Sequence, residues 1–135
     1  MLLLGSEVNF LHVIPPRQRA FTTLGRCVKE CTEQVTSRSS FIFFHCSDST
    51  VCYDFLQGLS PGGVRVLSGV LHSHLAGRRM RLRHLRGGRE LPPILSDESY
   101  DFNFQRSRAP APRSEAVVLP GDELLLECEY DTSAR

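Results

Sequence analysis

The chain has 135 residues, enough for one domain, and its 41% hydrophobic and 23% charged residues exclude a disordered or fibrous protein. A formal net charge of +1 excludes a histone-like or strongly acidic protein. No apolar run reaches the ~20 residues of a membrane span, and the N-terminus has no basic region typical of a signal peptide. Five cysteines nevertheless suit an oxidising compartment. Because a cysteine-rich chain without a signal peptide is unexpected there, we expect the sequence to be a piece of a longer chain.

Strand signals dominate the chain. Residues 24–35 are ambiguous between a short helix and an irregular loop. Residues 64–71 are β-branched and apolar on both faces, so we expect one strand covered on both sides. Residues 79–85 are the next predicted strand, and Gly87-Gly88 behind them suits a two-residue hairpin turn.

The C-terminal strand has the clearest pattern. After a turn at Pro120-Gly121-Asp122, one face carries Leu124, Leu126, Cys128 and Tyr130, and the other carries Glu123, Glu127, Glu129 and Asp131. This alternation predicts a half-buried antiparallel strand with an acidic outer face. Several short strands separated by turn residues predict an all-β fold, a partial antiparallel β-sandwich.

His72-Ser73-His74 is the sharpest local motif. On a strand, residues i and i+2 project to the same side, so two imidazoles can converge on one metal ion. A third ligand has to come from elsewhere, and imidazole suits zinc, copper, iron or nickel. The structural alternative is a pair of hydrogen-bonded histidines in a sheet.

The cysteines offer two further interpretations. Cys27, Cys31, Cys46 and Cys52 have the residue type for a zinc site, although their spacings lack the C-x-x-C knuckle. In a secreted chain, disulfides are favoured instead. Cys27 and Cys31 are too close in sequence to pair with each other, so each is expected to reach a distant strand.

A basic stripe contains Arg78, Arg79, Arg81, Arg83, Arg86 and Arg89. Binding to nucleic acid would require interleaved aromatic residues for stacking, and none lies within the stripe. We therefore interpret the stripe as a solvated strand and hairpin face, and we expect no nucleic-acid partner.

Five motifs occur in an order that resembles the C-terminal catalytic domain of the copper type II, ascorbate-dependent monooxygenases. The resemblance is closest to the dopamine β-hydroxylase-like (MOXD) group and covers residues 10–33 and 58–135. The motifs are Leu71-His72-Ser73-His74-Leu75-Ala76-Gly77-Arg78, Arg86-Gly87-Gly88-Arg89-Glu90, Tyr100-Asp101-Phe102-Asn103-Phe104-Gln105, Leu119-Pro120-Gly121-Asp122 and Glu127-Cys128-Glu129-Tyr130-Asp131-Thr132.

The resemblance implies a jelly-roll-like sandwich and an enzyme that hydroxylates a C–H bond of a small, phenethylamine-like substrate with dioxygen. Two coppers in two domains and ascorbate as reductant are implied for the full-length enzyme. His72 and His74 match two ligands of the oxygen-activating copper, and Cys27, Cys31 and Cys128 match disulfide cysteines. A location in the secretory pathway, in the endoplasmic reticulum or outside the cell, is implied as well.

The chain also departs from the family. The methionine ligand lies beyond Arg135 in the family, as do the expected partners of the cysteines, and the first domain with its histidine ligands is missing; we do not expect Met80 to substitute. We therefore expect residues 1–135 to be a partial domain, incomplete at its C-terminus, with 35–55 as an insertion and no activity alone. A non-catalytic copper-binding or inert truncated product is the alternative.

Overall fold

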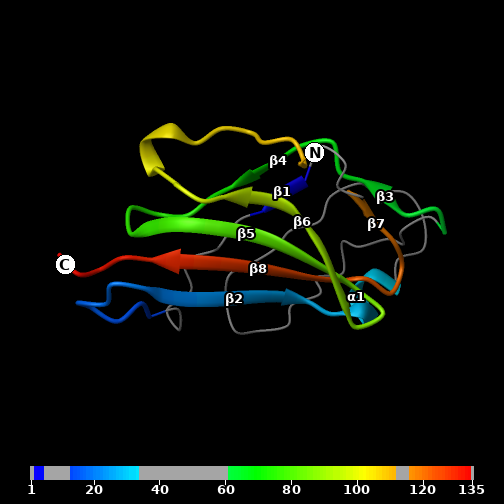
Figure 1. Ribbon diagram of the computed structural model, residues 1–135, viewed down its shortest axis with the longest axis horizontal. Coiled ribbons are helices and arrows are strands. Elements are labelled where there is room, and N and C mark those ends of the chain that lie inside the picture. Colours follow the sequence, from blue (N-terminus) through cyan, green and yellow to red (C-terminus); the bar gives the residue numbers. More distant parts are fainter. Residues whose placement is uncertain (1, 5–12, 34–60, 112–115, 135) are drawn as a thin grey trace.

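The computed structural model describes residues 2–4, 13–33, 61–111 and 116–134 (Figure 1). Nearly all regular structure in these ranges is strand, which confirms the all-β class. The strands are β1 (Leu2–Leu4), β2 (Phe21–Cys27), β3 (Val64–Arg65), β4 (Gly69–Leu71), β5 (Gly77–Arg86), β6 (Arg89–Asp97), β7 (Val117–Val118) and β8 (Glu123–Tyr130). A short helix α1 (Lys29–Glu33) and a 3-10 turn η1 (Phe102–Phe104) complete the described elements.

The central layer is a four-stranded antiparallel sheet in the order β2-β8-β5-β6. Its long strands lie side by side across the middle of the molecule (Figure 1). β5 and β6 form the predicted hairpin, with Arg86 opposite Arg89. Gly87 and Gly88 both have positive φ, 57° and 75°, as a tight primed turn requires. β3 pairs with β7 antiparallel, whereas β1 pairs with β4 in parallel, the one departure from antiparallel pairing in the described residues.

β8 shows the predicted alternation between a buried and a half-buried face. Its buried residues are Leu124, Leu126, Cys128 and Tyr130. They pack in one cluster with side chains that come from outside the sheet, namely Val66, Leu71, Ala116 and Val118. The apolar face of the sheet is therefore covered by a second layer, as in a sandwich.

The strand predicted over residues 64–71 is wrong in two respects. It is divided into β3 and β4, and Leu67 between them is 76% exposed rather than covered. The chain changes its pairing partner here from β7 to β1. Gly69 further exchanges two backbone hydrogen bonds with Arg108, which holds this segment at a distant loop.

The segment 24–35, ambiguous between a short helix and an irregular loop, begins instead as strand and continues as a short helix. Its first residues extend β2 to Cys27, and the helix α1 occupies only Lys29–Glu33. The predicted insertion 35–55 lies outside the described residues and stays a prediction. Within the described part of the chain, no helix is long and apolar enough to cross a bilayer.

Candidate metal centre

His72 and His74 lie directly after β4, in a segment without regular structure. The expectation that a strand carries both is wrong, because β4 ends at Leu71. Their rings nevertheless come together, with centroids 5.3 Å apart and planes inclined by 75°. His72 is half-buried and His74 is exposed, so the pair is open to solvent on one side.

The backbone between the two histidines is fixed by Tyr100. The Ser73 N–H donates to the Tyr100 hydroxyl over 3.1 Å, and the same hydroxyl donates to the Ser73 carbonyl. Burial raises the pKa of Tyr100, so the hydroxyl keeps the proton that it donates. Tyr100 is in turn held by its own N–H, which donates to the Arg78 carbonyl over 2.8 Å.

A tight turn follows the histidines. The Gly77 N–H donates to the His74 carbonyl over 2.8 Å. A Cβ on Gly77 would lie 2.6 Å from Ser73 Oγ, so only glycine fits this close approach. The segment from Ser73 to Gly77 is thereby closed on itself, which limits the movement of His74.

The segment that contains η1 lies beside the two imidazoles and contacts them. The Phe102 ring centroid lies 6.4 Å from that of His72 and 6.2 Å from that of His74. Gln105 Oε1 is 2.6 Å from His72 Nδ1. Phe102 and Gln105 both belong to the motif Tyr100-Asp101-Phe102-Asn103-Phe104-Gln105 in the sequence. Their contacts with the histidines can be seen only in the folded structure.

The pair fits a metal ion in its donor type and spacing. Two imidazoles that share a metal through bonds of ~2.0–2.1 Å have ring centroids no more than ~6.5 Å apart, and the observed 5.3 Å satisfies this limit. The described residues contain no group of three or more His, Cys, Asp or Glu side chains that could hold a metal. Met80 is buried in the core and lines the sheet instead. His72 and His74 as copper ligands stay a prediction.

The cysteines divide into separate cases. Cys27 is a buried free thiol, and burial raises its pKa to about 11, so the thiolate that a metal prefers is disfavoured. Cys128 is disulfide-bonded within this chain, so the expectation that its partner lies beyond Arg135 is wrong. The structure does not describe the side chain of Cys31, and Cys46 and Cys52 lie outside the described residues. The four-cysteine zinc site and the disulfide assignments of Cys27 and Cys31 therefore stay predictions.

Several arginines of the basic stripe pair with carboxylates on or next to the neighbouring strands. Arg83 contacts Glu90 at 2.8 Å and Glu127 at 3.2 Å. Arg81 donates two hydrogen bonds to Glu98, which lower the pKa of this carboxyl to about 2. Exposed pairs of this kind are typical of a solvated sheet face.

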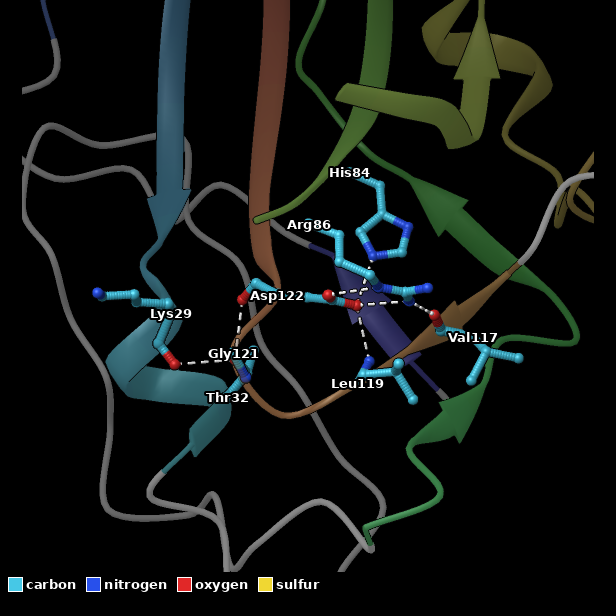
Figure 2. Close-up of polar contacts among 8 residues, drawn as sticks. All are labelled: Lys29, Thr32, His84, Arg86, Val117, Leu119, Gly121 and Asp122. Atoms are coloured by element: carbon cyan, nitrogen blue, oxygen red, sulfur yellow. Dashed lines mark hydrogen bonds and ion pairs between the residues drawn. The ribbon is translucent and has the colours of Figure 1, made fainter. Parts of the chain in front are cut away.

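The remaining described histidine, His84, belongs to a buried ionic cluster at the other end of β5. Its Nε2 donates to Asp122 Oδ2 over 2.6 Å, and Arg86 donates to both carboxylate oxygens over 2.8 and 2.9 Å (Figure 2). The Leu119 N–H donates to the same carboxylate over 2.7 Å. Thr32 of α1 donates to the Asp122 carbonyl over 2.8 Å. The cluster therefore joins the hairpin, the turn before β8 and α1.

Comparison with known proteins identifies relatives. The family model "Copper type II ascorbate-dependent monooxygenase, C-terminal domain" matches residues 44–135. The chain is 36% identical over 131 residues to human "DBH-like monooxygenase protein 1" and 36% identical over 135 residues to "MOXD1 homolog 1" of Drosophila melanogaster. It is 29% identical over 129 residues to "Dopamine beta-hydroxylase" of Canis lupus familiaris.

These matches cover 97%, 100% and 96% of the chain, in the same order. The chain in turn spans only 18%, 16% and 17% of the lengths of these relatives.

Proposed function

Because the chain belongs to the family of copper type II ascorbate-dependent monooxygenase C-terminal domains, we propose that it provides the copper site at which dioxygen is used. His72 and His74 are the two imidazole ligands in this proposal. Copper bound there would supply the redox chemistry that places one atom of dioxygen in a substrate C–H bond, with ascorbate as the reductant. The substrate is a small molecule, for which phenethylamine is the first compound to test.

The proposal rests on the closeness of the two imidazoles, which are carried by a backbone segment that is fixed in place. The centroids of their rings lie 5.3 Å apart, and hydrogen bonds from Tyr100 hold the backbone between them. A preformed pair requires little reorganisation on binding a metal. In this proposal each residue provides one ring nitrogen to the metal, and the Phe102 ring lies beside both imidazoles.

A second candidate function is copper binding without turnover. It requires only the two imidazoles that the structure brings together, with ring centroids 5.3 Å apart. Two imidazoles alone are a sufficient donor set for Cu(I), but they lack the soft thioether ligand that favours the reduced state in this chemistry. Assaying ascorbate-dependent hydroxylation of phenethylamine by the chain alone, and then with a first domain added, separates the two functions.

We further propose a location in the secretory pathway. The disulfide of Cys128 supports it, because disulfides persist in oxidising compartments and are rare in the cytosol.

Copper affinity tests the proposed site. Titration of the chain, with its disulfide intact, with Cu(I) against a chromophoric chelator is expected to give one bound copper. His72→Ala and His74→Ala should each weaken its affinity at least tenfold, because each removes one of two ligands. Leu75→Ala, at the exposed neighbouring position, serves as the control and should bind as the parent does. Parent-like copper affinity in both histidine variants would refute the assignment.

A further inference from the structure

The Gln105 side-chain amide bridges η1 and His72. Its Nε2 donates to the Phe102 carbonyl over 3.0 Å, and its Oε1 lies 2.6 Å from His72 Nδ1. The amide is thus held at both ends. Neither contact belongs to a strand ladder, so both depend on how this segment folds beside the histidines.

The two contacts together determine the proton position on His72. A carbonyl oxygen only accepts hydrogen bonds, so the Phe102 carbonyl requires the amide nitrogen of Gln105 to face it. The amide oxygen then faces His72 and can only accept as well. His72 Nδ1 must therefore carry the proton, and in a neutral imidazole this leaves Nε2 with its lone pair free.

The position of Gln105 is itself defined by local structure. The Asp101 carboxylate accepts from the Asn103 N–H over 2.9 Å and from Asn103 Nδ2 over 3.0 Å. It thereby caps η1, whose Phe102 carbonyl receives the Gln105 amide. The same segment begins at Tyr100, which binds Ser73 between the two histidines. One short segment therefore contacts both the backbone and a ring nitrogen of the histidine motif.

We propose that Gln105 is a positioning residue of the copper site, which fixes His72 in the Nδ1–H tautomer and so makes Nε2 the metal-binding nitrogen. The inference rests on the proposed copper-binding function. Ligand histidines in metal sites are held in this way by a partner on the second nitrogen, and losing such a partner typically weakens metal binding by 10- to 100-fold. Free neutral histidine favours the opposite, Nε2–H tautomer, so the Gln105 contact has a measurable effect even before metal is added.

The first test reads the tautomer in the metal-free chain. Two-bond ¹H–¹⁵N correlation spectra of the imidazoles, recorded at alkaline pH where histidine is neutral, should show His72 with a protonated Nδ1. Gln105→Leu, which removes the acceptor at similar size, should shift His72 toward the Nε2–H form. Gln105→Glu retains an acceptor oxygen and should keep the Nδ1–H form. An unchanged His72 tautomer in Gln105→Leu would overturn the proposal.

The second test measures Cu(I) affinity in the same variants. Gln105→Leu should weaken binding by 10- to 100-fold, whereas Gln105→Glu should remain within about threefold of the parent, as expected for a retained acceptor. Gln18→Leu, the same change at an exposed position before β2, is the matched control and should bind as the parent does. Equal unfolding midpoints of the Gln105 variants would show that the loss is not a folding defect.

The outcomes separate this inference from the proposed function. A parent chain that binds no copper would overturn the proposed function and the positioning role with it. A parent chain that binds copper through His72 and His74, with an unchanged affinity in Gln105→Leu, would overturn the positioning role alone.

Discussion

Asp122→Asn is expected to lower the free energy of unfolding by about 3 kcal/mol, because removing one partner of a buried ion pair leaves the other charge uncompensated. Asp122 is 1% exposed, and its carboxylate accepts hydrogen bonds from Arg86, His84 and the Leu119 N–H (Figure 2). Asparagine has the same shape but would turn an amide N–H toward these donors. Urea unfolding of parent and variant measures the difference.

Glu98→Gln is the matched control for this change. Glu98 also accepts two hydrogen bonds from an arginine, Arg81, but its side chain is 50% exposed. Water can replace the lost interaction, so the expected decrease is at most about 1 kcal/mol. Equal losses in Asp122→Asn and Glu98→Gln would contradict the role assigned to burial in the cluster.

The cluster also predicts how the effect varies with pH. Burial alone would raise the pKa of Asp122, but hydrogen bonds from Arg86, Leu119 and His84 outweigh burial and hold it below its ordinary value. A carboxyl with a lowered folded pKa stabilises the fold above its unfolded pKa, about 3.9. This stabilisation is lost as the pH falls through the folded pKa. The stability difference between parent and Asp122→Asn should therefore be constant above about pH 5 and shrink below about pH 4.

Leu82→Ala is expected to lower the free energy of unfolding by about 3 kcal/mol, within the range for a leucine deleted from a packed core. Leu82 is 0% exposed and lies in the register between Leu95 of β6 and Leu126 of β8. Both neighbours are buried, so the sheet cannot easily collapse into the space that the side chain leaves.

Leu67→Ala is the control, because it removes a leucine side chain from an exposed position instead of a buried one. Leu67 projects from the segment between β3 and β4 and is largely exposed, so its removal should change stability by less than about 0.5 kcal/mol. Chemical unfolding of the two variants under the same conditions compares them directly. A Leu67→Ala loss as large as that of Leu82→Ala would mean that the core is not where the structure places it.

Local patterns predicted β5, its hairpin turn and β8 in the central sheet, but not β2. The alternation in β8 and the Gly87-Gly88 turn are complete within a few neighbouring residues, so they can be recognised without knowing the fold. The run 64–71 could not be interpreted in this way, because its division depends on pairing with β1, β7 and Arg108. A β-branched run indicates extended backbone, but it does not tell which partner each residue pairs with.

The sequence suggested the two histidines of the candidate site, but not the contacts that surround them. His72 and His74 stand two residues apart, and this spacing alone suggested a shared metal. The supporting contacts from Tyr100 and Gln105 arise because a later loop folds back over the histidines. The buried pair of His84 and Asp122 was likewise not foreseen, since nothing in the separate sequence motifs shows that they meet.

The most direct test of the central claim is X-ray absorption at the copper edge of the Cu(I)-loaded chain. The proposed site predicts a first shell dominated by imidazole nitrogen at ~2.0 Å, with two imidazoles in the parent and one fewer in His72→Ala. A sulfur-dominated first shell that His72→Ala leaves unchanged would contradict the claim and assign the metal to cysteines instead.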